Sequence, residues 1–377
     1  MRKIIIGLAV VSAFALVRPA PSSAQEGLKA VAATLWNVVR APFQREGVTV
    51  KSASVPKSPV NLARPQEEAE EFWEALRDAG YELREFTTVI GIIPEAKLQY
   101  QMVRELSDAD RDAIESAINR YAVVVFRGQK LSDAQQIDFS AQFGPIHSSA
   151  QRARHQGIKH RLERTEIADI SNLDGDGNVL EVNARRRLDW LANRLWHTDA
   201  SFRAVPGALS LLYAHVIPDE GGDTEFADMR AAYDALPEKT KAQLEGLVAI
   251  HSIWHSRGQL DVNKAKYTPE EQAALPPVPQ RVVRTHPGSH RKTLYLAAHA
   301  SHIEGMPVPD GRLLLMDLME HATRPPFVHT HKWREGDLVV WDNRCTMHRA
   351  RPFDTTKVRD LRRVTTRDVA STLEQAA

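Results

Sequence analysis

Short apolar runs separated by turn-forming residues dominate the hydrophobic pattern of this chain. Ala122–Phe126 is apolar and rich in β-branched residues, which is typical of a buried strand. Many short strands joined by brief breaks favour a β-sandwich or a jelly roll. The other predicted strands are Ala208–Ile217, Arg281–Thr285, Lys292–Ala297, Phe327–Trp333 and Leu338–Trp341.

Helical patterns interrupt the strands at a few places. Ser107 and Ser132 each precede an apolar-periodic segment and are predicted N-caps, the second helix ending by Gly144. Residues 228–246 show helical patterns around Pro237. We therefore predict a mostly β fold with flanking helices.

The first hundred residues have a different character. A basic start, the apolar run Ile4–Val17 and the small residues Ser22–Ala24 form a pattern typical of a secretory signal, although a mistaken upstream start would look the same. Pro65 precedes an acidic helix predicted over Gln66–Asp78. The predicted organisation is a signal-like leader at 1–24, an N-terminal extension and linker at 25–100, a main domain at 101–370 and a tail at 371–377.

Composition argues against several kinds of binding partner and of structural site. The formal net charge of +1 gives no electrostatic reason to bind nucleic acid or an anionic membrane. Residues 150–190 are rich in Arg and His but lack interleaved aromatics, so a solvated segment is favoured there. The single cysteine, Cys345, excludes an intrachain disulfide framework and a Cys-based zinc cluster.

The stretch Trp196–Phe202 carries the strongest candidate chemistry. His197 and Asp199 are two residues apart, so both side chains leave the same face of an extended strand. An imidazole and a carboxylate are two thirds of the facial triad that holds non-heme Fe(II) with open coordination positions. The third ligand must come from another strand, and His348 is the candidate.

Other histidines could imitate this pattern. Chance alone would produce such triplets in a chain with 15 His and 48 acidic residues, and 302–304 is a second one. Gly305 follows it, so a solvated turn is expected there. His329 and His331 share a strand face, where packing is favoured over metal binding. Cys345 has an odd offset from His348 and should pack on the opposite face.

These motifs together resemble one enzyme family. Trp196–Phe202, Gly222–Thr224, Trp341–Ala350 and a late arginine pair resemble the taurine dioxygenase and 2,4-dichlorophenoxyacetate dioxygenase (TauD/TfdA) family, from about Leu106 to Val369. These are Fe(II)- and 2-oxoglutarate-dependent oxygenases on a double-stranded β-helix, a jelly roll of cupin type. The resemblance implies Fe(II), 2-oxoglutarate and O2 as cofactor and cosubstrates, and His197, Asp199 and His348 as iron ligands.

The resemblance also implies roles for residues around the metal. Thr224 would touch 2-oxoglutarate, and a guanidinium would hold its distal carboxylate as a planar fork. We favour Arg363 for that role, with Arg359 and Arg362 competing for it. The residues expected to line the substrate pocket are Arg367, on the substrate's acid group, His147 and Asn193.

The expected reaction is hydroxylation of a small anionic organic substrate, with release of succinate and CO2. Phrases around His197 and His348 resemble the phenoxyacetate branch, so an aryloxyalkanoate-like carboxylate is favoured over a sulfonate or sulfate ester. The alternatives are a cupin-like Zn or Mn isomerase or hydrolase and a non-catalytic jelly-roll binding module. No nucleic acid and no membrane partner is expected for the catalytic domain, and homo-oligomerisation is left open. Because 2-oxoglutarate and ferrous iron are plentiful in cytoplasm, we favour a cytoplasmic location, with export or periplasmic delivery through residues 1–24 as the alternative.

Overall fold

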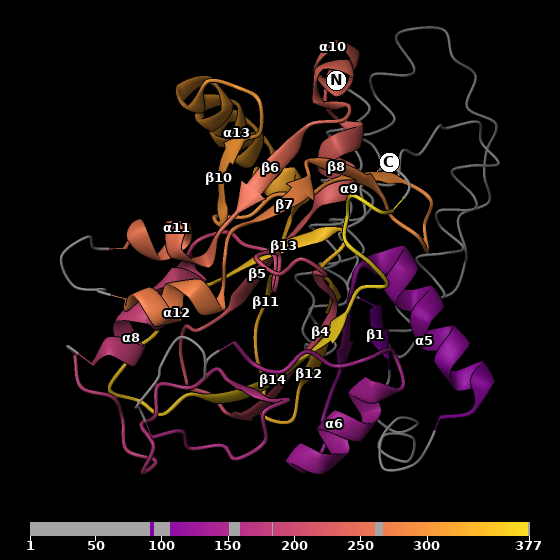
Figure 1. The fold of residues 1–377 in the computed structure, drawn as a ribbon. Helices are drawn as coiled ribbons and strands as arrows, with labels where there is room; N and C mark the ends of the chain where they lie inside the picture. Colours follow the sequence, from indigo (N-terminus) through magenta and orange to yellow (C-terminus); the bar gives the residue numbers. More distant parts are fainter. Residues whose placement is uncertain (1–90, 94–105, 151–158, 183, 261–266, 376–377) are drawn as a thin grey trace, which may run out of the picture. The chain divides into compact units, whose positions relative to one another are not determined.

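The computed structural model describes residues 91–93, 106–150, 159–182, 184–260 and 267–375. All of them belong to the unit Phe86–Ala377 (Figure 1). The predicted leader and the predicted acidic helix lie outside the described residues. Among the described helices, none combines the length and the apolar character that crossing a membrane requires.

The largest sheet has six strands in the order β1-β2-β12-β4-β14-β3. Its neighbouring strands pair antiparallel except for the parallel pair β1–β2. The strands are β1 Gly91–Ile93, β2 Val123–Phe126, β12 Leu338–Asp342, β4 Gly207–Val216, β14 Asp360–Arg367 and β3 Ala168–Asp169.

Three smaller sheets complete the strand content of the described residues. The sheet that matters most for the site has the order β11-β5-β13, formed by Val328–His331, Thr224–Asp228 and Thr346–Ala350. A second has the order β10-β6-β7, formed by Ala300–Ile303, Val248–His251 and Val278–Arg281. The third pairs β8 Val283–Thr285 with β9 Lys292–Leu294.

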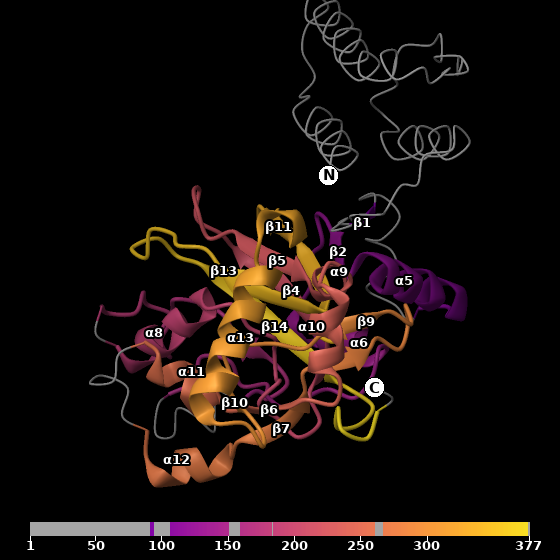
Figure 2. The ribbon, with the colours of Figure 1, turned by 90° about the horizontal axis from the view of Figure 1, so that it is seen from above.

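Helices flank these sheets, and both predicted N-caps are present. The Ser107 side chain accepts from the Asp110 backbone N–H ahead of α5, and Ser132 forms a capping box with Gln135 ahead of α6. Helix α13 lies against β10 (Figure 2). The described helices are α5 Asp108–Tyr121, α6 Asp133–Ala141, α8 Arg185–Trp190, η1 Leu191–Arg194, α9 Met229–Asp234, α10 Glu238–Leu244, α11 Ile253–Gly258, α12 Pro269–Ala274, α13 Val308–Ala322 and η2 Pro325–Phe327.

The large sheet is buried on both faces, which explains the continuous apolar run in β2. Val124 and Phe126 pack with residues of α5 and α6 on one face. Val123 and Val125 pack on the other face, in a cluster that includes Phe226 of β5. Alternate residues of one strand therefore serve two separate cores, and a polar residue would be costly at any of them.

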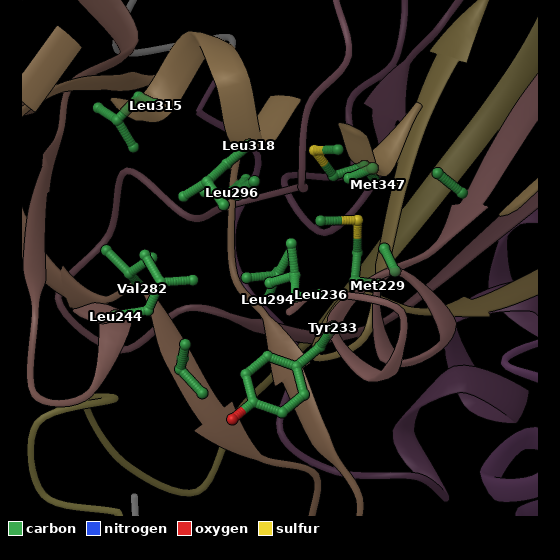
Figure 3. Close-up of a cluster of buried hydrophobic side chains, with 14 of the residues drawn as sticks. Met229, Tyr233, Leu236, Leu244, Val282, Leu294, Leu296, Leu315, Leu318 and Met347 are labelled. Atoms are coloured by element: carbon green, nitrogen blue, oxygen red, sulfur yellow. The ribbon is translucent and has the colours of Figure 1, made fainter. Parts of the chain in front are cut away.

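A third apolar cluster covers the opposite side of the sheet β11-β5-β13, called the small sheet below (Figure 3). Ala227, the neighbour of Phe226, belongs to it together with Met347 of β13. Helices α9 and α13 contribute Met229, Tyr233, Leu315 and Leu318. The strands that carry candidate site residues are thus fixed from both sides by packed side chains.

Several predicted strands need correction. Lys292–Ala297 is a strand only as far as Leu294, and Phe327–Trp333 only over Val328–His331. Arg281–Thr285 contains the end of β7 and the whole of β8. His302 lies in strand β10 rather than in a turn, because its main chain pairs with Ile250 of the distant strand β6.

Candidate metal centre

The main chain places two of the predicted ligands side by side. His348 lies in β13, and His197 forms an isolated antiparallel bridge with it. The His197 N–H donates to the His348 carbonyl at 3.0 Å, and the His348 N–H donates back at 2.8 Å. The chain then turns at Asp199 and Ala200, and Ala200 has a φ of 55°. This strand contact, which is one residue long, therefore places the two histidines side by side.

The structure brings all three predicted ligand side chains together. The His197 Nε2 lies 3.8 Å from Asp199 Oδ1, and the His348 Nε2 lies 3.7 Å from Asp199 Oδ2. All three residues are buried. Their candidate ligand atoms lie within 4.8 Å of one another.

The donor set fits a single divalent ion. The His197 Nδ1 lies 2.8 Å from the Leu195 carbonyl and donates to it, so the lone pair of Nε2 faces Asp199. Separations of 3.7 and 3.8 Å are too long for hydrogen bonds between these groups. Two donor atoms that each lie about 2.1 Å from one ion can be at most about 4.2 Å apart, and both of these separations are below that limit. Two imidazoles and a carboxylate on one side suit ferrous iron with open positions.

The electrostatic environment keeps the donors in the form that a metal needs. Burial lowers the pKa of both His197 and His348, so both imidazoles are neutral at pH 7. Burial by itself would raise the pKa of Asp199. The charge of Arg363 and a hydrogen bond from Ser210 outweigh it and lower that pKa. The carboxylate is therefore ionised without any metal-dependent proton release.

A hydrogen-bond network orients Asp199 from behind. The Ser210 hydroxyl donates to Asp199 Oδ2 at 2.8 Å, and the Asn343 amide nitrogen donates to the Ser210 oxygen at 2.9 Å. The Asn343 carbonyl oxygen accepts from the Asp199 backbone N–H at 3.3 Å and from the Trp341 indole at 3.0 Å. Sequence reasoning missed Ser210, because a serine inside an apolar strand carries no signal of what it faces.

The three competing arginines separate clearly by their contacts. Arg363 Nη1 donates to Asp199 Oδ1 at 2.5 Å. Arg362 is instead bound to two acids, Asp133 of α6 at 2.6 Å and Asp360 at 3.2 Å. Its guanidinium is neutralised away from the candidate ligands, which leaves Arg359 and Arg363 as candidates for holding 2-oxoglutarate.

Arg359 is a buried cation beside the turn that leads to Thr224. Only 2% of its surface is exposed. Its guanidinium donates to the carbonyls of Gly222 at 3.2 Å and Ile170 at 3.4 Å. Burial lowers the pKa of Arg359 to about 10. Thr224 is buried as well, and its hydroxyl accepts from the Trp333 indole at 3.0 Å.

The predicted substrate residues are spread over three segments. The His147 Nε2 lies 3.3 Å from the Pro206 carbonyl. Arg367 is exposed at the end of β14, and Asn193 is half-buried in η1, close before His197 along the chain. These positions leave their substrate contacts as predictions.

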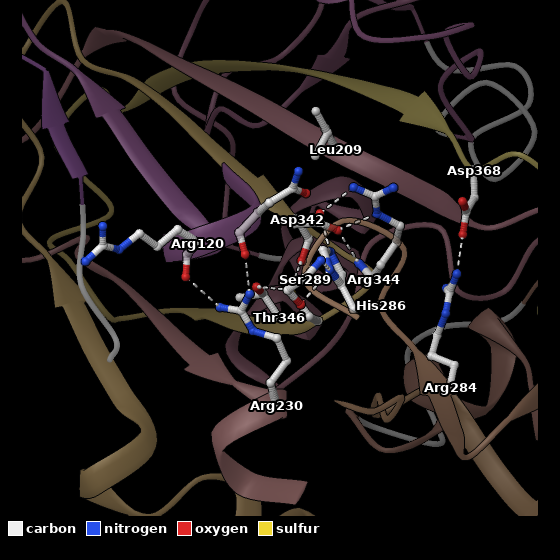
Figure 4. A network of polar contacts seen from close by, with 12 residues as sticks. Arg120, Leu209, Arg230, Arg284, His286, Ser289, Asp342, Arg344, Thr346 and Asp368 are labelled. Atoms are coloured by element: carbon white, nitrogen blue, oxygen red, sulfur yellow. Dashed lines mark hydrogen bonds and ion pairs between the residues drawn. The ribbon is translucent and has the colours of Figure 1, made fainter. Parts of the chain in front are cut away.

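A second group of ligand-type side chains is a charge-paired network (Figure 4). His286, Asp342 and Cys345 are completely buried together. The Ser289 backbone N–H donates to His286 Nδ1 at 3.0 Å, so the hydrogen on Nε2 donates to Asp342 Oδ2 at 2.9 Å. Arg344 binds the same carboxylate at 2.6 Å. The His286 imidazole and the Asp342 carboxylate are therefore already paired with neighbouring groups of the protein.

The remaining residues of metal-ligand type lie apart from the three predicted iron ligands. Cys345 is buried, as predicted, and its neighbours of metal-ligand type are His286 and Asp342 rather than the three predicted iron ligands. His331 packs against Trp333 and lies 3.2 Å from Asp337. Neither His329 nor His331 belongs to either group of candidate ligands found in the described residues.

Known proteins share both the sequence and the fold. Residues 82–365 match the family described as taurine catabolism dioxygenase TauD, TfdA family. An alpha-ketoglutarate-dependent 2,4-dichlorophenoxyacetate dioxygenase of Burkholderia sp. (strain RASC) is 49% identical over 261 residues, covering 69% of this chain and 86% of that relative. An alpha-ketoglutarate-dependent sulfate ester dioxygenase of Pseudomonas putida is 31% identical over 267 residues, covering 69% and 82%. The crystal structure of AAD-2 in complex with Mn(II) and N-oxalylglycine has a TM-score of 0.68 and 46% identity, covering 77% of this chain and 98% of that one.

Proposed function

This chain belongs to the TauD/TfdA family, and on that premise we propose that it oxidises a small organic acid, with an aryloxyalkanoate-like carboxylate as the favoured substrate. It is an Fe(II)- and 2-oxoglutarate-dependent dioxygenase. When bound, Fe(II) and 2-oxoglutarate activate O2 for attack on a substrate C–H bond, with succinate and CO2 as co-products. The observation that carries the proposal is the buried convergence of His197, Asp199 and His348, which we propose as the iron ligands.

The comparisons support this function over the alternatives. The relatives named above are alpha-ketoglutarate-dependent dioxygenases, rather than zinc or manganese isomerases or non-catalytic binding modules. The similar solved structure contains Mn(II) together with N-oxalylglycine. A binding module would also have no need for the ionised carboxylate and neutral imidazoles that this site maintains.

We propose that one arginine binds 2-oxoglutarate and that a second arginine binds the acid group of the substrate. The sequence favours Arg363 for the distal carboxylate of 2-oxoglutarate, but the contacts favour Arg359. Arg359 is buried, and among the described residues its guanidinium forms no ion pair with an acid; it donates to the carbonyl of the Gly222 turn that leads to Thr224. Arg363 contacts Asp199 itself, so it lies beside the metal, where the acid group next to an oxidised carbon would sit. A fork that meets a carboxylate gives a strong, oriented contact in either place.

Matched substitutions separate these roles. Arg359→Gln should raise the KM for 2-oxoglutarate by about 10- to 100-fold, because a charge-assisted contact is lost. Arg363→Gln should mainly raise the KM for phenoxyacetate. Succinate formation at varied concentrations of each compound measures both constants. If Arg363→Gln raises the KM for 2-oxoglutarate and Arg359→Gln does not, the assignment of Arg363 from the sequence is correct and the assignment of Arg359 is wrong.

The substrate class can be tested with a small panel. The wild-type protein should form succinate fastest with phenoxyacetate-type acids and more slowly with alkyl sulfonates and sulfate esters of similar size. A relative is named as a sulfate ester dioxygenase, so that compound is the informative competitor. Succinate formation that is greatest with the sulfate ester would reverse the preferred substrate while leaving the reaction class intact.

The same proposal covers the finer features of the protein. The large sheet and the small sheet share an apolar cluster between them, which supports a double-stranded β-helix of cupin type. We propose that Thr224 contacts 2-oxoglutarate and that His147, Asn193 and Arg367 line the substrate pocket. We also propose that the enzyme works in the cytoplasm, where 2-oxoglutarate and ferrous iron are available.

A further inference from the structure

Three basic side chains gather where separate segments meet near the end of β14. The Arg203 guanidinium donates to the Ser148 carbonyl at 2.9 Å. The Arg367 backbone N–H donates to the Pro145 carbonyl at 2.6 Å. His147 lies between those two contact points along the chain and is close enough for both arginines to affect its charge. The fold therefore brings Arg203 and Arg367 to the same short segment, 145–148.

The charge of this cluster is not balanced from within. In the part of the chain that the structure describes, neither Arg203 nor Arg367 forms an ion pair with a carboxylate. Burial and the charge of Arg367 lower the pKa of Arg203. Burial and the neighbouring arginines lower the pKa of His147 to about 4, so it is neutral at pH 7. Two like charges held together in this way favour an anion between them.

The cluster lies a short distance beyond the metal ligands. The Thr365 hydroxyl lies 3.2 Å from the Ser210 hydroxyl, which in turn donates to Asp199 at 2.8 Å. Arg367 is two residues past Thr365, about 7 Å further along the strand. Arg203 follows Asp199 closely in the chain and reaches the same region. This spacing is close to the length of an aromatic ring together with the groups attached at its two ends.

We propose that Arg203 and Arg367 form a remote anion subsite, which binds an oxyanion on the end of the substrate opposite the C–H bond that is oxidised. In an aryloxyacetate the oxidised carbon is next to the carboxylate, and that acid group belongs near Arg363. The remote subsite would then take a second acidic group, a carboxylate or a sulfonate on the aromatic ring. This inference rests on the proposed function and adds Arg203 as a specificity-determining residue.

Binding measurements test the subsite directly. The full chain, loaded with Mn(II) and 2-oxoglutarate without O2, is titrated calorimetrically with 4-carboxyphenoxyacetate and with phenoxyacetate. The wild-type protein should bind the doubly charged acid about 10-fold or more tightly than phenoxyacetate, because two charge-assisted contacts are added. Arg203→Gln and Arg367→Gln should each reduce that preference by about 10-fold or more, and Arg203→Lys should restore part of it. Arg312→Gln, an exposed arginine on α13, is the matched control and should keep the preference.

The outcomes separate this inference from the proposed function. Equal binding of the two acids by the wild-type protein, or an undiminished preference in Arg203→Gln, would overturn the subsite. Turnover of phenoxyacetate together with that result would leave the dioxygenase assignment standing. A preference that depends on Arg203 supports the subsite even if neither acid is oxidised, in which case the substrate class is wrong and the subsite is right.

Discussion

At the residue scale, Asp199 is the most heavily supported side chain of the site. Its two carboxylate oxygens face the two imidazoles, and Ser210 and Arg363 also contact them. The Ser210 hydroxyl links the carboxylate to Asn343. Groups that orient a ligand in this way usually change metal affinity by about 10- to 100-fold when they are removed.

We therefore expect Ser210→Ala to weaken binding of Mn(II) or Fe(II) by about 10-fold or more. Asp199 would lose one hydrogen bond, and the buried Asn343 amide would lose its acceptor. Calorimetry under anaerobic conditions measures the change. Ser140→Ala is the control, since Ser140 is equally buried but bonds to Gln136 within its own helix. Wild-type metal affinity in Ser210→Ala would show that the network plays no part in holding the ion.

At the element scale, the turn between β12 and β13 positions His348. Asp342 ends β12 and binds both Arg344 and His286, while Cys345 leads directly into β13. The His197 bridge then holds the other edge of β13. The strand that carries this proposed ligand is thus fixed by its turn at one end and by His197 along its side.

We predict that His286→Ala destabilises the protein by about 2 kcal/mol or more, because a buried charged group loses a hydrogen-bond partner. Urea unfolding of the metal-free protein measures this change without a contribution from bound metal. Lys332→Ala, at an exposed position, should have little effect. An unchanged urea midpoint in His286→Ala would mean that Arg344 alone is sufficient to stabilise the buried Asp342 carboxylate.

The sequence predicted these elements unevenly, for reasons that particular residues show. The caps at Ser107 and Ser132 depend on neighbours within one turn, so local pattern revealed them. The placement of His302 depends on pairing with a strand far away in sequence, and local turn residues were misleading. The ranking of Arg359 against Arg363 needed to know which one reaches an acid, and spacing in a strand does not show that.

At the scale of the whole molecule, packed cores surround the site and bury several ionisable groups. His251 is completely buried on β6, and burial lowers its pKa to about 3. The unfolded chain binds a proton at this position below about pH 6.5, whereas the folded protein does not. Folding stability should therefore be complete above about pH 6.5 and should fall as the pH decreases from there toward about 3.

The expected slope from this one histidine is at most about 1.4 kcal/mol for each pH unit. Urea unfolding at pH 7 and pH 5 should show lower stability at pH 5 for the wild-type protein and a smaller difference for His251→Gln. Other buried histidines will contribute to the wild-type slope, so the comparison between the two proteins carries the test. An equal pH dependence in both would mean that His251 is not neutral in the folded state.

The central claim is that His197, Asp199 and His348 hold one ferrous ion to which 2-oxoglutarate can chelate. Visible absorption of the full chain without O2 tests it most directly. The wild-type protein should develop a weak charge-transfer band only when Fe(II) and 2-oxoglutarate are both present. The band should be absent in His197→Ala and retained in His302→Ala, which removes the histidine of the other triplet. A band of full strength in His197→Ala, or none in the wild-type protein, would contradict this account.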